Sequence, residues 1–153
     1  MPQRSAGLLL YRRRESGIEV FLVHPGGPFW AKKDLGSWSI PKGLYEPQED
    51  PLEAAKREFE EETGFTAPSK GYIAMGEIKQ PSGKIVVAWA VEGDCDASAL
   101  RSNLCTIEWP PRSGRTIEIP EIDRGQWFTL DEANRHILPG QCSFLDRLSQ
   151  IAI

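Results

Sequence analysis

Residues 43–65 read GLYEPQEDPLEAAKREFEEETGF, and this segment marks both ends of a helix. The pair Asp50-Pro51 is typical of a helix start, because the aspartate side chain accepts backbone N–H groups of the first turn and proline suits the first helical position. Glu53 follows three residues after Asp50, which predicts a capping box. Gly64 stands where a left-handed residue commonly ends a helix. The segment therefore predicts a helix over residues 50–63.

The carboxylates of this helix gather along one edge. At about 100° per residue, three apolar side chains form the predicted buried face: Leu52, Ala55 and Phe59. Glu58, Glu61 and Glu62 fall on one arc beside that face, since residues three and four apart are helix neighbours, whereas Glu60 points to the far side. Arg57 is the one cation within reach. The arc is either a solvated acidic face or a site for a hard divalent cation such as Mg²⁺.

The rest of the chain alternates short apolar runs with turn residues and predicts a fold of the α/β class. The predicted strands are Ala6–Tyr11, Glu19–His24, Ser37–Ile40, Tyr72–Gln80, Lys84–Glu92, Cys105–Trp109 and Gln126–Leu130. The first two are expected to pair, and the fourth and fifth to form a hairpin about Pro81. Two further helices are predicted, Asp131–His136 and Ser143–Ile151. We expect one domain over residues 1–153, with a mixed β-sheet and helices packed against it.

The composition of the chain argues against several classes of binding partner. The 153 residues carry a net charge of −4, with 40% hydrophobic and 26% charged residues, as in ordinary globular proteins. Without blocks of Lys or Arg, we expect no duplex nucleic acid and no anionic membrane as partner. No apolar stretch approaches the roughly 20 residues of a membrane span, and no secretory signal is evident, so we expect a cytoplasmic protein.

The charge is unevenly distributed. Residues 46–62 hold eight acidic and two basic side chains, a net charge of −6, which leaves +2 on the remainder. This distribution suits a cation together with a polyphosphate. The three cysteines, Cys95, Cys105 and Cys142, are odd in number and widely spaced, so we expect reduced core thiols. His24 and His136 lack metal-ligand spacing, and we expect them to be structural.

The whole segment 43–65 matches the 23-residue signature of the Nudix hydrolases, with Gly43, Glu49, the triplet at 57–59, the pair at 61–62 and Gly64-Phe65 at the defined positions. The resemblance continues more loosely upstream in WSIPKG (residues 38–43) and downstream in EIDRGQWFTL (residues 121–130). It implies the Nudix fold, a mixed β-sheet sandwiched between α-helices. It also implies hydrolysis of a phosphoanhydride bond in a nucleoside diphosphate derivative.

The resemblance assigns roles to residues of the helix. Glu58, Glu61 and Glu62 would ligate Mg²⁺, with Mn²⁺ as an alternative, and the backbone carbonyl of Gly43 would be a further ligand. Arg57 would orient the glutamates through charge-assisted hydrogen bonds; the alternative is an ordinary surface ion pair. Glu49 would either stabilise its loop or add an outer contact to the metal site.

The general base stays open at this point, because Nudix hydrolases differ in which glutamate they use. Glu58 competes with two glutamates of a late loop, Glu118 and Glu121. For either late residue, a solvated carboxylate is the competing interpretation.

Substrate-binding candidates lie outside the signature. In the segment from Trp109 to Arg115, an aromatic residue is followed by a rigid turn and two cations, Arg112 and Arg115. The tryptophan could stack on a base and the arginines could hold phosphates; the alternative is a surface connection. Lys42, beside Gly43, is a further phosphate contact, as are Lys32 and Lys33 unless they are simply solvated. Trp30 is a second candidate for base stacking.

Three functions compete. The first is a Mg²⁺-dependent diphosphohydrolase that acts on a small-molecule nucleotide, with nucleoside triphosphates and dinucleoside polyphosphates ranked before ADP-ribose. The second is a Nudix module that binds a nucleotide without hydrolysis. The third is a purely structural acidic helix, which would gain no thermal stability from Mg²⁺ or Mn²⁺. The oligomeric state is left open.

Overall fold

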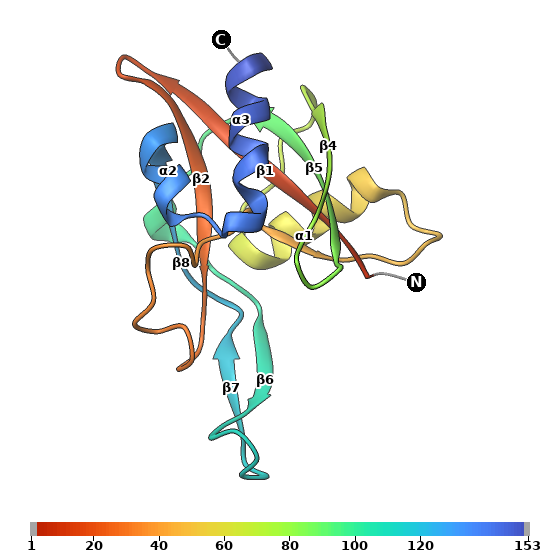
Figure 1. Ribbon diagram of the computed structural model, residues 1–153, viewed down its shortest axis with the longest axis vertical. Coiled ribbons are helices and arrows are strands. Elements are labelled where there is room, and N and C mark those ends of the chain that lie inside the picture. The colour runs from red at the N-terminus through yellow and green to blue at the C-terminus, as the bar shows by residue number, and fades with distance from the viewer. Residues whose placement is uncertain (1–2, 152–153) are drawn as a thin grey trace.

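A mixed β-sheet forms the centre of the computed structural model, which describes residues 3–151 (Figure 1). The strand order is β4-β5-β1-β2-β8, and β3 also pairs with β1. The strands are β1 (Arg4–Arg14), β2 (Gly17–Pro25), β3 (Lys42–Leu44), β4 (Ile73–Lys79), β5 (Ile85–Glu92) and β8 (Ile122–Thr129). Among the strand pairings of this sheet within the described residues, β1 with β5 is parallel and the others are antiparallel.

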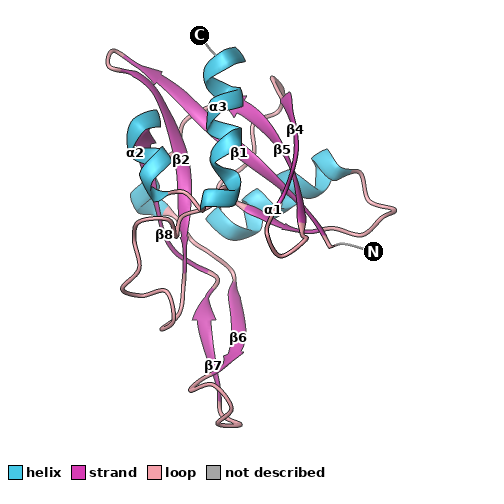
Figure 2. Cartoon of the chain, in the orientation of Figure 1, coloured by secondary structure: helices cyan, strands magenta, loops and turns pink. Residues whose placement is uncertain are grey.

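Helices cover both faces of this sheet (Figure 2). They are α1 (Pro51–Thr63), α2 (Leu130–His136) and α3 (Cys142–Ile151), with short 3₁₀ turns η1 (Ala97–Ala99) and η2 (Pro139–Gln141). Side chains of β1 alternate between two cores: Leu8 and Leu10 pack with Phe59 of α1, whereas Leu9 packs with Phe144 of α3. The predicted sandwich of a mixed sheet between helices is confirmed.

The ends of α1 follow the sequence signals closely. The carboxylate of Asp50 accepts the backbone N–H of Glu53 at 3.0 Å. The capping box is incomplete: within the described residues the carboxylate of Glu53 makes no hydrogen bond back to Asp50, and it lies instead 3.4 Å from the ammonium of Lys56. Gly64 adopts φ 77° and donates its N–H to the carbonyl of Glu60 at 2.9 Å, as a helix-ending glycine should.

The strand predicted over Ser37–Ile40 is wrong. Trp38 and Ser39 form two isolated bridges to different neighbours, Trp38 with Ile137 and Ser39 with Val23. Because the segment divides its backbone hydrogen bonds between the end of α2 and β2, no ladder can propagate along it. The strand leading into the helix is instead β3.

The prediction for residues 105–109 was incomplete. Strand β6 (Leu104–Glu108) pairs with β7 (Thr116–Pro120), which was not predicted, and the two form a separate two-stranded sheet. This β6–β7 arm (residues 104–120) projects away from the central sheet (Figure 1). The backbone N–H of Glu121 donates to the carbonyl of Asn103 at 2.9 Å and closes the base of the arm.

The other predicted elements are found with shifts of a few residues at their ends, including both C-terminal helices. All three cysteines are free thiols, half-buried rather than fully in the core. The ring of His24 is fully buried, with Nδ1 2.9 Å from the Asp123 carboxylate and Nε2 2.6 Å from the Lys33 carbonyl, which is a structural role. Between residues 3 and 151, no helix has the length and apolar character to cross a membrane.

Candidate active site

Gly43 and Glu58 meet where β3 crosses α1. Gly43 pairs with Ala6 of β1, which fixes the strand against the helix. A Cβ atom on Gly43 would overlap the carboxylate of Glu58 and lie 2.8 Å from its Cγ. Glycine therefore permits this close approach, and any larger residue would displace the Glu58 carboxylate, which rests directly against the β3 backbone.

Glu62 extends from the next turn of α1 toward the same strand. It is 6% exposed, and its carboxylate accepts the backbone N–H of Lys42 at 3.2 Å. Burial raises the pKa of Glu62 to about 8, and repulsion from Glu121 adds to the shift, while the Lys42 N–H opposes it. A carboxylate in this position favours a compensating positive charge.

Glu58 is in a similar situation. Burial raises the pKa of Glu58, and the charges of Glu61 and Glu121 add to the shift, although a hydrogen bond from Arg57 opposes it. The charge of Glu121 thus helps to raise the pKa of both Glu58 and Glu62, which places Glu121 near both glutamates of the helix.

Arg57 binds several of the carboxylates of this site. Its guanidinium donates to Glu49, and to Glu58 at 3.1 Å, and lies 3.8 Å from Glu61. Glu49 in turn accepts the backbone N–H of Glu46 at 3.0 Å. Glu49 thus stabilises its loop and fixes Arg57 at the same time, and Arg57 contacts two of the three glutamates predicted on the arc.

Glu121 lies near α1 because backbone hydrogen bonds join the segment before β6 both to the end of α1 and to the segment after β7. The carbonyls of Glu61 and Thr63 at the end of α1 accept the backbone N–H groups of Asn103 (3.0 Å) and Arg101 (2.8 Å). Asn103 then accepts the N–H of Glu121. The end of α1 is capped in this way, and Glu121 is placed beside the glutamates of the helix.

A cleft of about 370 Å³ opens next to these carboxylates. It is lined by the backbone of Gly43 and by several polar or aromatic side chains: Glu62, Glu121, Lys42, Lys84, Gln80 and Trp30. Burial lowers the pKa of Lys42, and the charge of Glu62 opposes that shift. The cleft is therefore lined by two carboxylates, two lysine side chains and an aromatic ring.

The donors fit a magnesium ion. In the part of the chain that the structure describes, no three His, Cys, Asp or Glu side chains converge closely enough to enclose a metal. Mg²⁺ does not need such an enclosure, because it usually binds through one or two carboxylates, several waters and substrate phosphates. The coupled charges of Glu58 and Glu62, beside the backbone of Gly43, supply hard oxygen donors of this kind.

The structure separates the predicted substrate-binding residues. Lys42 and Trp30 line the cleft. Trp109, Arg112 and Arg115 lie instead at the connection between β6 and β7, the far end of the arm, and are not among the cleft-lining residues. There the Glu108 carboxylate accepts the backbone N–H of Arg112 at 3.0 Å. A nucleotide contact by the arm tip stays a prediction.

The late glutamates are separated in the same way. Glu118 is exposed on β7, opposite Thr106, whereas Glu121 lines the cleft. Sequence reasoning missed Lys84 and Gln80, which enter the cleft from the turn between β4 and β5. Only their position beside the predicted turn at Pro81 could have suggested them.

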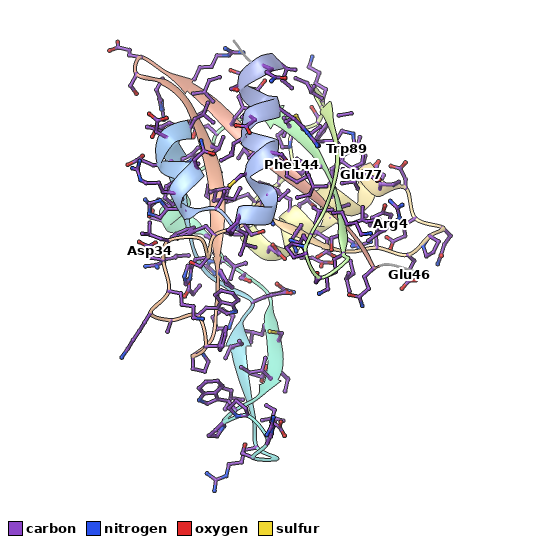
Figure 3. All side chains as sticks on the ribbon, in the orientation of Figure 1. Arg4, Asp34, Glu46, Glu77, Trp89 and Phe144 are labelled. Carbon is purple, nitrogen blue, oxygen red and sulfur yellow. The ribbon has the colours of Figure 1, made fainter. Side chains whose placement is uncertain are left out.

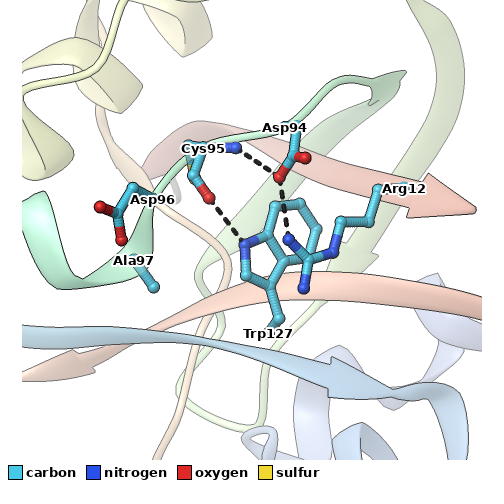
Figure 4. Close-up of a pocket in the computed structure, with 6 residues that line it drawn as sticks. All are labelled: Arg12, Asp94, Cys95, Asp96, Ala97 and Trp127. Atoms are coloured by element: carbon cyan, nitrogen blue, oxygen red, sulfur yellow. Dashed lines mark hydrogen bonds and ion pairs between the residues drawn. The ribbon is translucent and has the colours of Figure 1, made fainter. Parts of the chain in front are cut away.

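Another hollow, which none of these carboxylates line, is built from side chains that bond to one another (Figure 4). The guanidinium of Arg12 lies 4.1 Å from the centre of the Trp127 ring and donates to Asp94 at 2.9 Å. The indole N–H of Trp127 donates to the Cys95 carbonyl at 3.0 Å. These mutual bonds identify a structural cluster that joins β1, β8 and the segment after β5.

Comparison with known proteins identifies the family of this chain. The family model described as NUDIX domain matches residues 1–147, so the chain belongs to the Nudix family. The bis(5'-nucleosyl)-tetraphosphatase [asymmetrical] of Mus musculus is 31% identical over 103 residues, which cover 60% of this chain and 66% of the relative. The match thus spans just under two thirds of that relative's length.

A second relative and a solved structure are also similar to this chain. The RNA pyrophosphohydrolase of Erythrobacter litoralis is 50% identical over 42 residues, 28% of this chain and 26% of the relative. The crystal structure of a C. elegans Ap4A hydrolase binary complex superposes with a TM-score of 0.66 at 22% identity, covering 97% of each chain. The latter shows the fold, which is the Nudix fold.

Proposed function

We propose that this chain is a Mg²⁺-dependent pyrophosphohydrolase that cleaves a phosphoanhydride bond in a nucleotide, with a dinucleoside polyphosphate such as diadenosine tetraphosphate (Ap4A) ranked first. The observation that carries the proposal is a cleft that Glu62 and Glu121 line together with Lys42 and Lys84, next to the point where the Glu58 carboxylate rests against Gly43. Anionic and cationic groups side by side suit a metal ion and a polyphosphate bound together.

The reaction adds water to phosphorus. The water oxygen forms a bond to the phosphorus atom, and the bridging anhydride oxygen leaves with the bonding electrons. Glu58, Glu61, Glu62 and the carbonyl of Gly43 would hold the metal. Once bound, Mg²⁺ would neutralise phosphate charge and lower the pKa of a coordinated water.

The chain's own groups divide the remaining work. Arg57 keeps Glu58 and Glu61 in position through its guanidinium. Glu121 is our choice for the general base: its carboxylate would accept the proton of the attacking water, with Glu58 as the alternative. Geometry favours Glu121 because it lines the cleft, while Glu118 is exposed on the arm.

Substrate recognition would use other residues that line the cleft. Lys42 and Lys84 would contact phosphate oxygens, and Trp30 would stack on a base. The ranking of Ap4A rests on the mouse and C. elegans relatives, whose names state that activity.

A substrate panel tests the proposal. Purified protein is incubated with Mg²⁺ and with Ap4A, ATP and ADP-ribose, and the products are separated by anion-exchange chromatography. We expect release of AMP and ATP from Ap4A, and a loss of a hundredfold or more in kcat/KM for Glu58→Gln and Glu62→Gln. Glu53→Gln, on the same helix with its side chain in solvent, is the matched control and should stay within about twofold. No turnover of any of these nucleotides by the wild-type protein would refute the proposal.

A further inference from the structure

Another pocket adjoins the cleft at Leu44 of β3. Its volume is about 680 Å³, larger than that of the cleft. Its walls come mainly from the loop between β3 and α1 and from the start of β1: Arg4, Leu44, Tyr45, Pro47, Glu49 and Pro51. We call it the loop pocket; it occupies the end of the molecule where Arg4 and Glu46 lie (Figure 3).

The loop pocket and the cleft share a wall. Ser5 lines the cleft, Arg4 lines the loop pocket, and the two are consecutive in β1. Leu44, the β3 partner of Ser5, lines both hollows and is 54% exposed. Leu44 is therefore a side chain that the two hollows share, and a linear ligand in the cleft can extend over it toward the loop pocket.

The chemistry of the loop pocket differs from that of the cleft. Tyr45 packs one side against the core under α1, and its neighbours Pro47 and Pro51 are rigid and apolar. Glu46 adds negative charge, whereas Glu49 is paired with the guanidinium of Arg57 and the guanidinium of Arg4 is paired with the Glu77 carboxylate at 3.1 Å. This surface disfavours phosphate.

A neutral, flat group with hydroxyls suits such walls better. Small-molecule sites of several hundred Å³ are typically apolar and aromatic with a few polar groups that orient the ligand. A nucleobase can stack on Tyr45, and ribose hydroxyls can donate to Glu46 or Glu49, which as carboxylates only accept. Phosphates belong with the lysines of the cleft.

We propose that the loop pocket binds the second nucleoside of a dinucleoside polyphosphate whose phosphate chain lies in the cleft. The inference rests on the proposed function and specifies how that function distinguishes a dinucleoside from a mononucleoside substrate. Leu44 is the ridge that the polyphosphate crosses, and Tyr45 is the residue that determines the preference.

The test compares Ap4A with adenosine 5'-tetraphosphate, which has the same phosphate chain but one nucleoside fewer. Steady-state kcat/KM is measured for both with Mg²⁺. We expect the wild-type protein to prefer Ap4A by about tenfold or more, which corresponds to about 1.4 kcal/mol of transition-state binding. Tyr45→Ala should reduce this ratio to near one, and Leu44→Ala should lower it partly.

Two matched variants control for loss of packing. Tyr72 packs against the same core as Tyr45 but does not line the loop pocket, so Tyr72→Ala should keep the wild-type ratio. Ile151 is 46% exposed on α3, and Ile151→Ala serves in the same way for Leu44→Ala. Tyr45→Phe, which keeps the ring, should retain most of the preference and covers the case in which Tyr45→Ala does not fold.

The outcomes separate the two proposals. If the wild-type protein cleaves both nucleotides with equal kcat/KM, or if Tyr45→Ala and Tyr72→Ala change the ratio alike, the loop pocket is not a nucleoside site although the proposed function stands. If neither nucleotide is cleaved, the proposed function fails and the inference falls with it.

Discussion

Replacing Glu62 by Gln should stabilise the metal-free protein in alkaline solution. Glu62 is buried, and its pKa in the folded state is about 8, against 4.5 for an unperturbed glutamate. Between these two pH values the unfolded chain has lost the proton that the folded chain still holds. The free energy of unfolding therefore falls as pH rises from about 4.5 to about 8, and then levels off.

The size of the effect follows from the shift. At about 1.4 kcal/mol per pH unit, the loss between these limits is about 5 kcal/mol. For a chain of this length, 1 kcal/mol moves Tm by roughly 2–4 °C, so the Glu62 contribution alone should lower Tm by roughly 10 °C or more. Gln keeps a side-chain oxygen for the Lys42 N–H and carries no charge.

Thermal unfolding followed by circular dichroism in EDTA, from pH 5 to pH 8.5, measures this difference. Wild type and Glu62→Gln should unfold at similar temperatures near pH 5 and diverge as pH rises, with the variant the more stable at pH 8.5. Millimolar Mg²⁺ should raise the wild-type Tm most at high pH, because it compensates the ionised carboxylate. Glu53→Gln should follow the wild-type curve. Parallel curves for wild type and Glu62→Gln would refute the assignment of an ionisation penalty to this residue.

Three further substitutions test particular contacts. Gly43→Ala places a Cβ onto the Glu58 carboxylate and should lower kcat on Ap4A at least tenfold with little change in the far-ultraviolet circular dichroism spectrum; a fully active variant would contradict the close approach. Arg57→Lys replaces a planar group that contacts three carboxylates by a point charge, and should lower kcat about tenfold at saturating Mg²⁺. Gly64→Ala forces a side chain to φ 77° at 2.9 Å from the Arg101 carbonyl, and should cost about 1–3 kcal/mol in urea unfolding; an unchanged midpoint would argue against this strain.

The helix and its carboxylate edge could be predicted because their signals are local. Asp50, Gly64 and the spacing of the glutamates act within one or two helical turns, and the structure reproduces them. Helical periodicity places Glu62 beside the buried face of α1. The burial of Glu62, however, depends on its contact with β3, and no sequence pattern predicted that strand. Local periodicity says which way a side chain points, not what covers it.

The errors arise where partners are distant in sequence. Residues 37–40 look like a strand, yet Trp38 and Ser39 bond to segments about 100 and 16 residues away, and only those partners decide that no ladder forms. The same holds for Lys84, which lies outside the signature, and for Tyr45, which stands at one of its undefined positions: each reaches its pocket through the pairing of β1 with β5 or β3. Such placement follows from sheet register, which no local pattern encodes.

The bond between Asn103 and Glu121 makes the β6–β7 arm a replaceable module. It joins the two ends of residues 104–120 at 2.9 Å, and the end of α1 anchors Asn103 from the other side. Because the entropy of loop closure grows only slowly with length, a longer or shorter insertion between these two residues costs little. Related chains can therefore vary the arm in length and sequence, and protein engineers can graft other hairpins there, while Glu121 keeps its position.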